Sequence, residues 1–274
     1  MPKTEDIQLN LKPFDIHKIN KASVVVFIGR RGSGKSIAIK DLLYHNKDIP
    51  LGLVMSHTDH LSHFYDQFIP EMLIHKRFDT LQIKKLFERQ KKALDENWQH
   101  PEAFIVLDDV LSDKSWKKDE NVQELHFNGR HYKLLGIIGL QNAMGIPPEL
   151  RGQVDYTFIF KTNNFNERKK LYENYAGAIK SFEIFNIILD ATTEDHHCLV
   201  IDNKTLSNHM EDQIFYYKAK LHDKFKICSN DIWQINDKKK FQQESIKYNS
   251  TYTKIEKSIS KGKGKMVINK KLTK

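Results

Sequence analysis

The sequence predicts an α/β fold in which a mostly parallel β-sheet is covered by helices on both faces. Strand-like and helix-like segments alternate along the chain, and several of the strand-like segments are apolar at every residue. Strands that are buried on both faces have this pattern, which is typical of parallel sheets with helices on either side. Hydrophobic residues make up 39% of the chain and charged residues 29%, which is a composition that can bury a core.

The elements follow from local patterns. Residues 23–28 (SVVVFI) are β-branched and aromatic, which predicts a buried strand, and a glycine-rich turn separates them from a helix over 34–44. Residues 59–98 have a mostly helical pattern that is broken near Pro70, and the two prolines at 147–148 indicate a loop. The remaining predicted helices cover 81–94, 119–130 and 167–175, and the remaining strands cover 51–56, 103–107, 134–140, 156–160 and 198–201, with an edge strand over 213–217.

The strongest functional signal is the segment GRRGSGKS, which fits the phosphate-loop pattern G-x-x-x-x-G-K-[ST] without deviation. It follows a predicted buried strand and opens a predicted helix. The glycines let the backbone pass close to phosphate, and the N–H groups of the loop and the helix N-terminus hold the anion. We expect Lys35 to reach the β- and γ-phosphates of a nucleotide and Ser36 to bind Mg²⁺. The predicted nucleotide-binding residues are Gly29, Arg30, Arg31, Gly32, Ser33, Gly34, Lys35 and Ser36.

Two carboxylates follow another predicted strand. The apolar run FIVL ends in Asp108 and Asp109, and Asp108 lies 73 residues after Lys35. We predict that Asp108 holds Mg²⁺ through water and that Asp109 polarises the attacking water as the general base. Acidic pairs at strand ends also form simple turns, and the phosphate loop elsewhere in the chain favours the catalytic interpretation.

A third predicted strand, over 134–140, ends in Gln141. An amide at this position can sense the γ-phosphate or orient water. Because ligands of open α/β sheets bind beyond the carboxyl ends of the strands, we place Gln141 at the same edge as the other catalytic residues.

The motifs together resemble those of a known superfamily over about residues 10–220. They are Pro13-Phe14-Asp15, GRRGSGKS, FIVLDDV, ELHFNGRHY, GLQNAMGIPPELRGQVDY, ERKKLYENYAG and CLVIDN. The sequence is similar to FtsK–HerA ATPases, and most of all to the genome-packaging ATPases of nucleocytoplasmic large DNA viruses and their virophages. FtsK-type pumps usually have Glu where this chain has Asp109, and the viral branch has Asp there.

This resemblance implies a three-layer P-loop NTPase fold of the additional-strand, RecA-like type, with an extra strand between the phosphate-loop strand and the acidic strand. It implies an ATP-hydrolysing motor, with Mg²⁺, that moves double-stranded DNA into a preformed capsid. The expected assembly is a homo-oligomeric ring, a pentamer or hexamer, at a capsid or portal vertex. The expected location is the virion or the viral factory in the host cytoplasm.

Ring ATPases of this kind complete each site with an arginine from a neighbouring subunit, which can raise the rate by about 10³–10⁵. The resemblance selects Arg168, because it lies just past the predicted strand 156–160. Arg151 and Arg130 are the second choices. The alternative for each of them is a surface salt bridge.

DNA is expected to pass through the centre of the ring. A candidate pore loop is the lysine-rich segment that follows the acidic strand, in which Trp116 would act as a lever or a stacking face. The alternative, slightly favoured, is an exposed helix start with Trp116 packed on the core. The candidate DNA-binding residues of this loop are Lys114, Trp116, Lys117 and Lys118.

The positive charge of the chain is concentrated at its C-terminal end. The net charge is +9, and residues 238–274 alone contain twelve lysines and two glutamates, so the rest of the chain is close to neutral. We predict an ATPase domain over 1–237 and a flexible basic tail over 238–274 that binds nucleic acid through its lysines; a purely solubilising tail is the alternative. The first lysines of this tail, Lys238, Lys239 and Lys240, complete the DNA-binding candidates.

Several classes of protein are excluded. No apolar stretch approaches the roughly 20 residues that span a bilayer, and residues 1–10 lack the apolar core of a secretory signal. Two cysteines exclude a disulfide scaffold and fit a reducing compartment. The other functions that remain open are another P-loop enzyme, such as a nucleotide kinase or a helicase-like translocase, and a non-hydrolysing, nucleotide-gated DNA-binding or assembly subunit.

Overall fold

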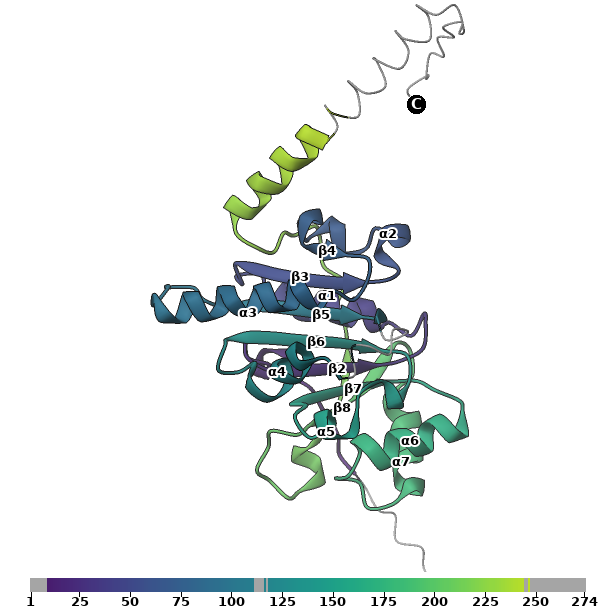
Figure 1. The fold of residues 1–274 in the computed structure, drawn as a ribbon. Helices are drawn as coiled ribbons and strands as arrows, with labels where there is room; N and C mark the ends of the chain where they lie inside the picture. The colour runs from purple at the N-terminus through teal and green to yellow at the C-terminus, as the bar shows by residue number, and fades with distance from the viewer. Residues whose placement is uncertain (1–8, 111–115, 117, 244–245, 247–274) are drawn as a thin grey trace, which may run out of the picture. The chain divides into compact units, whose positions relative to one another are not determined.

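The computed structural model describes residues 9–110, 116, 118–243 and 246 (Figure 1). The chain divides into two units, Met1–Ser229 and Asn230–Lys274. In the described part of the second unit, residues 230–243 form a helix. Residues 238–243, which we expected to be flexible, are therefore helical, and the first unit ends eight residues before the predicted boundary at 237.

A mixed, mostly parallel sheet forms the centre of the first unit. Its nine strands among the described residues have the order β1-β9-β8-β7-β2-β6-β5-β3-β4, and only β8 runs antiparallel to its neighbours. The predicted parallel sheet is thus confirmed. The strands are β1 (Lys12–Pro13), β2 (Val24–Ile28), β3 (Leu51–Ser56), β4 (Ile74–His75), β5 (Ala103–Asp108), β6 (Leu134–Leu140), β7 (Tyr156–Phe160), β8 (His197–Asp202) and β9 (Ile214–Lys218).

The helices connect these strands and cover the sheet (Figure 1). None of the described helices is long and apolar enough to cross a membrane. The α-helices of the first unit are α1 (Lys35–His45), α2 (Asp59–Ser62), α3 (Thr80–Asp95), α4 (Glu120–Asn128), α5 (Pro148–Arg151), α6 (Phe165–Tyr175) and α7 (Phe182–Thr192). The short 3₁₀ helices are Ile16–Lys18, Tyr65–Gln67, Glu71–Leu73, Ala143–Gly145 and Met210–Asp212.

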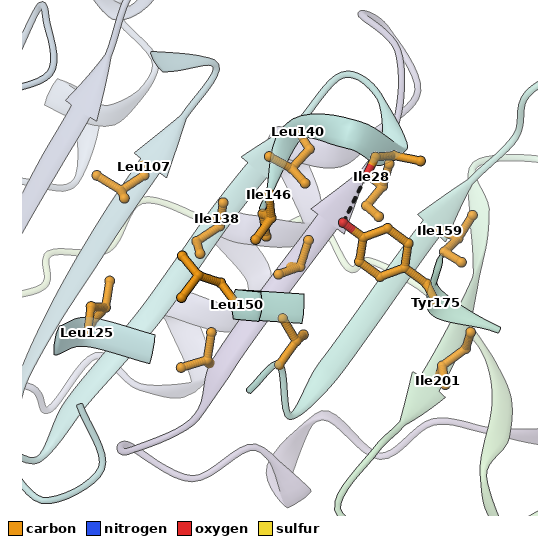
Figure 2. Packing of buried hydrophobic residues seen from close by; sticks show 14 of the residues in the cluster. Ile28, Leu107, Leu125, Ile138, Leu140, Ile146, Leu150, Ile159, Tyr175 and Ile201 are labelled. Atoms are coloured by element: carbon orange, nitrogen blue, oxygen red, sulfur yellow. Dashed lines mark hydrogen bonds between the residues drawn. The ribbon is translucent and has the colours of Figure 1, made fainter. Parts of the chain in front are cut away.

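Two separate hydrophobic clusters, one on each face of the sheet, explain why the strands are apolar throughout. In β2, Val24, Val26 and Ile28 point to one cluster, and Val25 and Phe27 point to the other. The first cluster includes side chains of α3, α4, α5, α6 and α7, and the second includes those of α1. Figure 2 shows part of the first cluster, where the Tyr175 hydroxyl also donates a hydrogen bond of 2.9 Å to the carbonyl of Ala143. The sheet is therefore the middle layer of three.

The predicted extra strand is present. β6 lies between the phosphate-loop strand β2 and the acidic strand β5 and is parallel to both. This places the ends of three strands, and the residues that follow them, next to one another at one edge of the sheet.

Some elements differ from the expectations. The region 59–98 contains only one long helix, α3, since short 3₁₀ turns and β4 precede it, and Pro147–Pro148 lead directly into α5. The helix α7 was not predicted. β9 is not the edge strand, because residues 12–13 pair with its Phe215 and Tyr216, and Pro13 suits the edge position since it has no N–H to donate.

Candidate active site

The phosphate loop joins β2 to α1. Gly34 is the N-cap of α1 and has a φ of 100°, a left-handed conformation that glycine adopts without steric penalty. No side chain caps the first turn of this 11-residue helix. Its first N–H groups therefore have no side-chain acceptor, which together with the helix dipole makes an anion-binding site.

Asp108, the last residue of β5, is 3% exposed, and its two carboxylate oxygens have different surroundings. Oδ2 accepts a hydrogen bond of 2.8 Å from the hydroxyl of Tyr65. Oδ1 is buried without a hydrogen-bond partner among the described residues, and the Lys35 Nζ lies 3.5 Å from it. Burial raises the pKa of Asp108, and the charge of Lys35 opposes that shift. A buried carboxylate oxygen with spare acceptor capacity is a suitable ligand for a hard cation such as Mg²⁺.

The neighbouring strand leaves room for this carboxylate. Gly139 of β6 pairs with Asp108, and a Cβ atom at position 139 would lie 2.2 Å from Asp108 Oδ1. Any larger residue would have to displace the carboxylate. Gly139 therefore fixes the space in which Oδ1 lies.

Asp109 turns the chain away from β5. Its φ of 54° lies in the left-handed region, which Asp tolerates better than most residues, and its N–H donates to the carbonyl of Gly139. The Asp109 Oδ1 lies 2.5 Å from Lys35 Nζ. The Lys35 ammonium is thus held by both carboxylates that the sequence analysis selected.

A cavity of about 680 Å³ opens over these residues. Most of the predicted nucleotide and catalytic residues line it, including the exposed Gln141; Gly29 and Ser33 do not. The predicted residues in its wall are Arg30, Arg31, Gly32, Gly34, Lys35, Ser36, Asp108, Asp109 and Gln141. Other residues of the wall are Ile37, Thr58, Ser62, Phe64, Tyr65, His196, Lys218, Ala219 and Leu221.

Tyr65 is the contact of the candidate site that sequence reasoning missed most clearly. It is 2% exposed, and its 3₁₀ turn lies in the region 59–98 that we expected to be mainly helical. A tyrosine 43 residues from its partner carboxylate has no local pattern that would indicate the contact. A turn signal after the strand over 51–56 would at most have placed it near the same sheet edge.

The three candidate arginines lie outside the cavity wall. Arg168, in the first turns of α6, forms two hydrogen bonds with Asp190 of α7, and its Nε donates to the carbonyl of Thr162. Arg151 donates to Asn174 and to the carbonyl of Ile146. Arg130 is exposed in the turn between α4 and β6. A role in the site of another subunit remains a prediction for each of them.

The candidate DNA contacts have mixed outcomes. Trp116 is 1% exposed and belongs to the first hydrophobic cluster, so in this conformation its ring is not available to stack on a base, and the core alternative applies. Lys118 is exposed, while Lys114 and Lys117 lie outside the described residues. Lys238, Lys239 and Lys240 are exposed on the helix 230–243.

Sequence comparison gives viral relatives over most of the chain. The protein "L437" of Acanthamoeba polyphaga mimivirus is 35% identical over 222 residues, which is 78% of each chain. The protein "075L" of Invertebrate iridescent virus 6 is 39% identical over 223 residues, 77% of this chain and 86% of that protein.

Comparison of structures identifies the same fold in a viral NTPase. The genome packaging NTPase B204 from Sulfolobus turreted icosahedral virus 2, in complex with sulfate, superimposes with a TM-score of 0.53 at 20% identity and covers 75% of this chain and all of its own. Its complex with AMPPCP gives a TM-score of 0.53 at 19% identity over 74% of this chain. The three-layer P-loop NTPase fold is thereby confirmed.

A family model agrees with the resemblance found in the motifs. Residues 12–233, most of the chain, match the model of the Poxvirus A32 protein. The predicted similarity to viral packaging ATPases is confirmed, and the chain belongs to the Poxvirus A32 protein family.

Proposed function

We propose that this protein is an ATPase motor that moves double-stranded DNA into a viral capsid. The observation that carries the proposal is the meeting of Lys35, Asp108, Asp109 and Gln141 at one cavity, beyond the ends of three adjacent strands. Family membership and the fold shared with B204 support the packaging role.

Different residues of the cavity bind the triphosphate and the magnesium ion. The loop backbone and the N-terminus of α1 bind the triphosphate, and Lys35 lies against its β- and γ-phosphates. Ser36 and Asp108 are the residues that would hold Mg²⁺, and the Oδ1 of Asp108, which accepts no hydrogen bond among the described residues, fits this assignment. Mg²⁺, when bound with the nucleotide, neutralises charge on the phosphate oxygens.

We infer that Lys35 and Asp109 change partners when the nucleotide binds. In the structure the Asp109 Oδ1 lies 2.5 Å from the ammonium of Lys35, so this oxygen is occupied by the ion pair. Phosphate oxygens compete for Lys35, so nucleotide binding releases Asp109. The freed carboxylate then polarises the water that attacks the γ-phosphorus, with Gln141 orienting that water, and ADP and phosphate are formed.

Two further contributions, a trans-acting arginine and the contacts with DNA, depend on the oligomer. We infer a homo-oligomeric ring, a pentamer or hexamer at a capsid or portal vertex, in which Arg168 of one subunit reaches the nucleotide of the next. The exposed Lys238, Lys239 and Lys240 would follow the DNA backbone, since lysines bind phosphates without sequence preference. The expected location is the virion or the viral factory in the host cytoplasm.

The test is the rate of ATP hydrolysis with and without duplex DNA, measured together with the mass of the assembly. We expect hydrolysis that requires Mg²⁺, increases with duplex DNA and accompanies a ring-sized assembly. Hydrolysis that is indifferent to DNA and instead depends on a small phosphate acceptor would contradict the motor and favour a kinase. Nucleotide binding without any turnover, with or without DNA, would contradict the ATPase.

A further inference from the structure

A second cluster of potential metal ligands includes two residues of α1, the helix that follows the phosphate loop. Asp41 and His45 are one turn apart on α1, and His222 comes from the segment after β9, 181 residues further along the chain than Asp41. The Asp41 Oδ1 lies 2.5 Å from His222 Nε2 and 3.3 Å from His45 Nε2. All three potential ligand atoms lie within 4.8 Å of one another, so a single ion could contact them after small movements.

The surrounding residues hold this cluster in place. The other carboxylate oxygen of Asp41, Oδ2, accepts hydrogen bonds from the Tyr217 hydroxyl and from the backbone N–H of Lys220, at 2.7 Å in the second case. The ring of His222 stacks on that of Tyr44, with centroids 3.6 Å apart. Secondary contacts of this kind are what fix the orientation of metal ligands in proteins.

A hydrogen-bonded group without a metal is the simpler interpretation, but it explains the arrangement less well. The Asp41 side chain is fully buried, and Oδ1 is approached by two imidazole rings while Oδ2 already has two donors. Two histidines that lie far apart in the sequence, His45 and His222, therefore approach the same carboxylate oxygen. Two imidazole nitrogens and one carboxylate oxygen are a common ligand set of Zn²⁺, which is tetrahedral and accepts water as its fourth ligand.

We propose that Asp41, His45 and His222 bind a zinc ion that fastens the segment after β9 to α1. Residues 218–221 immediately precede His222, and three of them, Lys218, Ala219 and Leu221, line the nucleotide cavity. The ion would therefore hold one wall of that cavity against the helix that carries Lys35. The proposal depends on these side chains alone and not on the proposed ATPase activity.

The experiment measures zinc on the full-length protein after removal of any histidine tag and treatment with a chelator. Zn²⁺ binding is followed by equilibrium dialysis, and Co²⁺ replaces Zn²⁺ to report the coordination by its visible absorption. We expect stoichiometric Zn²⁺ binding and the intense absorption of tetrahedral Co²⁺. His45→Gln and His222→Gln each remove a proposed ligand, so each should weaken binding by at least the roughly tenfold that follows loss of a residue that only orients a ligand. His60→Gln, an exposed histidine on α2, is the matched control and should bind as the parent does.

Thermal unfolding with and without zinc distinguishes a variant that has lost zinc binding from one that does not fold. Zinc should raise the melting temperature of the parent and of His60→Gln, and should raise that of a folded His222→Gln by clearly less. No Zn²⁺ bound by the parent would overturn the proposal. Equal loss of binding in all three variants, or Co²⁺ absorption that persists in both His45→Gln and His222→Gln, would overturn it as well.

Discussion

Lys35 and Arg168 are both assigned to the phosphate of the nucleotide, and both are held by carboxylates, but in different surroundings. The side chains of Lys35, Asp108 and Asp109 are 6%, 4% and 17% exposed, whereas Arg168 is 14% exposed and its partner Asp190 is 58% exposed. The contrast is largest between the carboxylates: Asp108 is closed off from water, whereas water can take the place of the Asp190 carboxylate or of its partner. The difference indicates that the first group is the fixed chemistry of one subunit, while Arg168 can exchange its partner for one on a neighbouring subunit.

The largest effect is expected from the buried group, which consists of Lys35 and its two carboxylate partners, Asp108 and Asp109. Lys35→Ala should abolish ATP hydrolysis, and the loss of the cation between two carboxylates should lower the free energy of unfolding by about 3–5 kcal/mol. Asp109→Asn should also abolish hydrolysis but keep nucleotide binding, because the amide remains polar and cannot accept the proton. Steady-state ATPase rates and nucleotide-binding titrations check both variants. Hydrolysis at the parental rate by Asp109→Asn would show that Asp109 is not the base.

The next effect in size concerns Arg168. Arg168→Ala should slow hydrolysis by about 10³-fold or more with little change in nucleotide binding, since its guanidinium would act on the developing charge. Mixing Arg168→Ala with Lys35→Ala separates a role within the subunit from one in a neighbour. Mixed rings should recover activity, because a Lys35→Ala subunit still supplies its arginine to an intact site.

Arg151→Ala is the comparison for this experiment, as Arg151 is the second choice for the same role. If mixing restores nothing while Arg168→Ala alone is inactive, Arg168 acts within its own subunit. If Arg151→Ala and not Arg168→Ala loses activity, the assignment belongs to Arg151.

A smaller effect is expected from Tyr65, which touches the buried group without carrying charge. Tyr65→Phe removes the hydrogen bond to Asp108 Oδ2 and keeps the aromatic ring that packs in the core. We expect the Mg²⁺ concentration for half-maximal hydrolysis to rise by about tenfold, since loss of a residue that hydrogen-bonds to a metal ligand weakens metal binding by this order. Tyr216→Phe, on β9, is the matched control. An unchanged Mg²⁺ requirement in Tyr65→Phe would show that Tyr65 only fills space.

Sequence reasoning located the buried group because its residues carry local signals. The phosphate-loop pattern fixes Lys35, and uninterrupted apolar runs fix the strands β5 and β6 that end at Asp108 and before Gln141. Parallel strands then bring their carboxyl ends to one edge, which is a rule about topology and needs no coordinates.

The same reasoning failed where a contact joins distant segments without a local pattern. Tyr65 meets Asp108 across 43 residues, and His222 meets Asp41 across 181. The helix α7 was missed although its buried residues, Phe185, Ile188, Leu189 and Thr192, recur at the spacing of one helix face. Because α7 was not predicted, its Asp190 could not be predicted as the partner of Arg168 either.

The smallest effect is expected from the partner of Arg168. Asp190→Asn weakens an exposed ion pair, so the free energy of unfolding should change by no more than about 1 kcal/mol. Because Arg168 is then easier to transfer to a neighbouring nucleotide, hydrolysis should stay at the parental rate or rise a few-fold, and the rise should fade as salt screens the original pair. Glu173→Gln, which removes another exposed ion pair of α6, is the control. A loss of activity as large as that of Arg168→Ala would mean that the pair itself, and not the exchangeable arginine, is what hydrolysis requires.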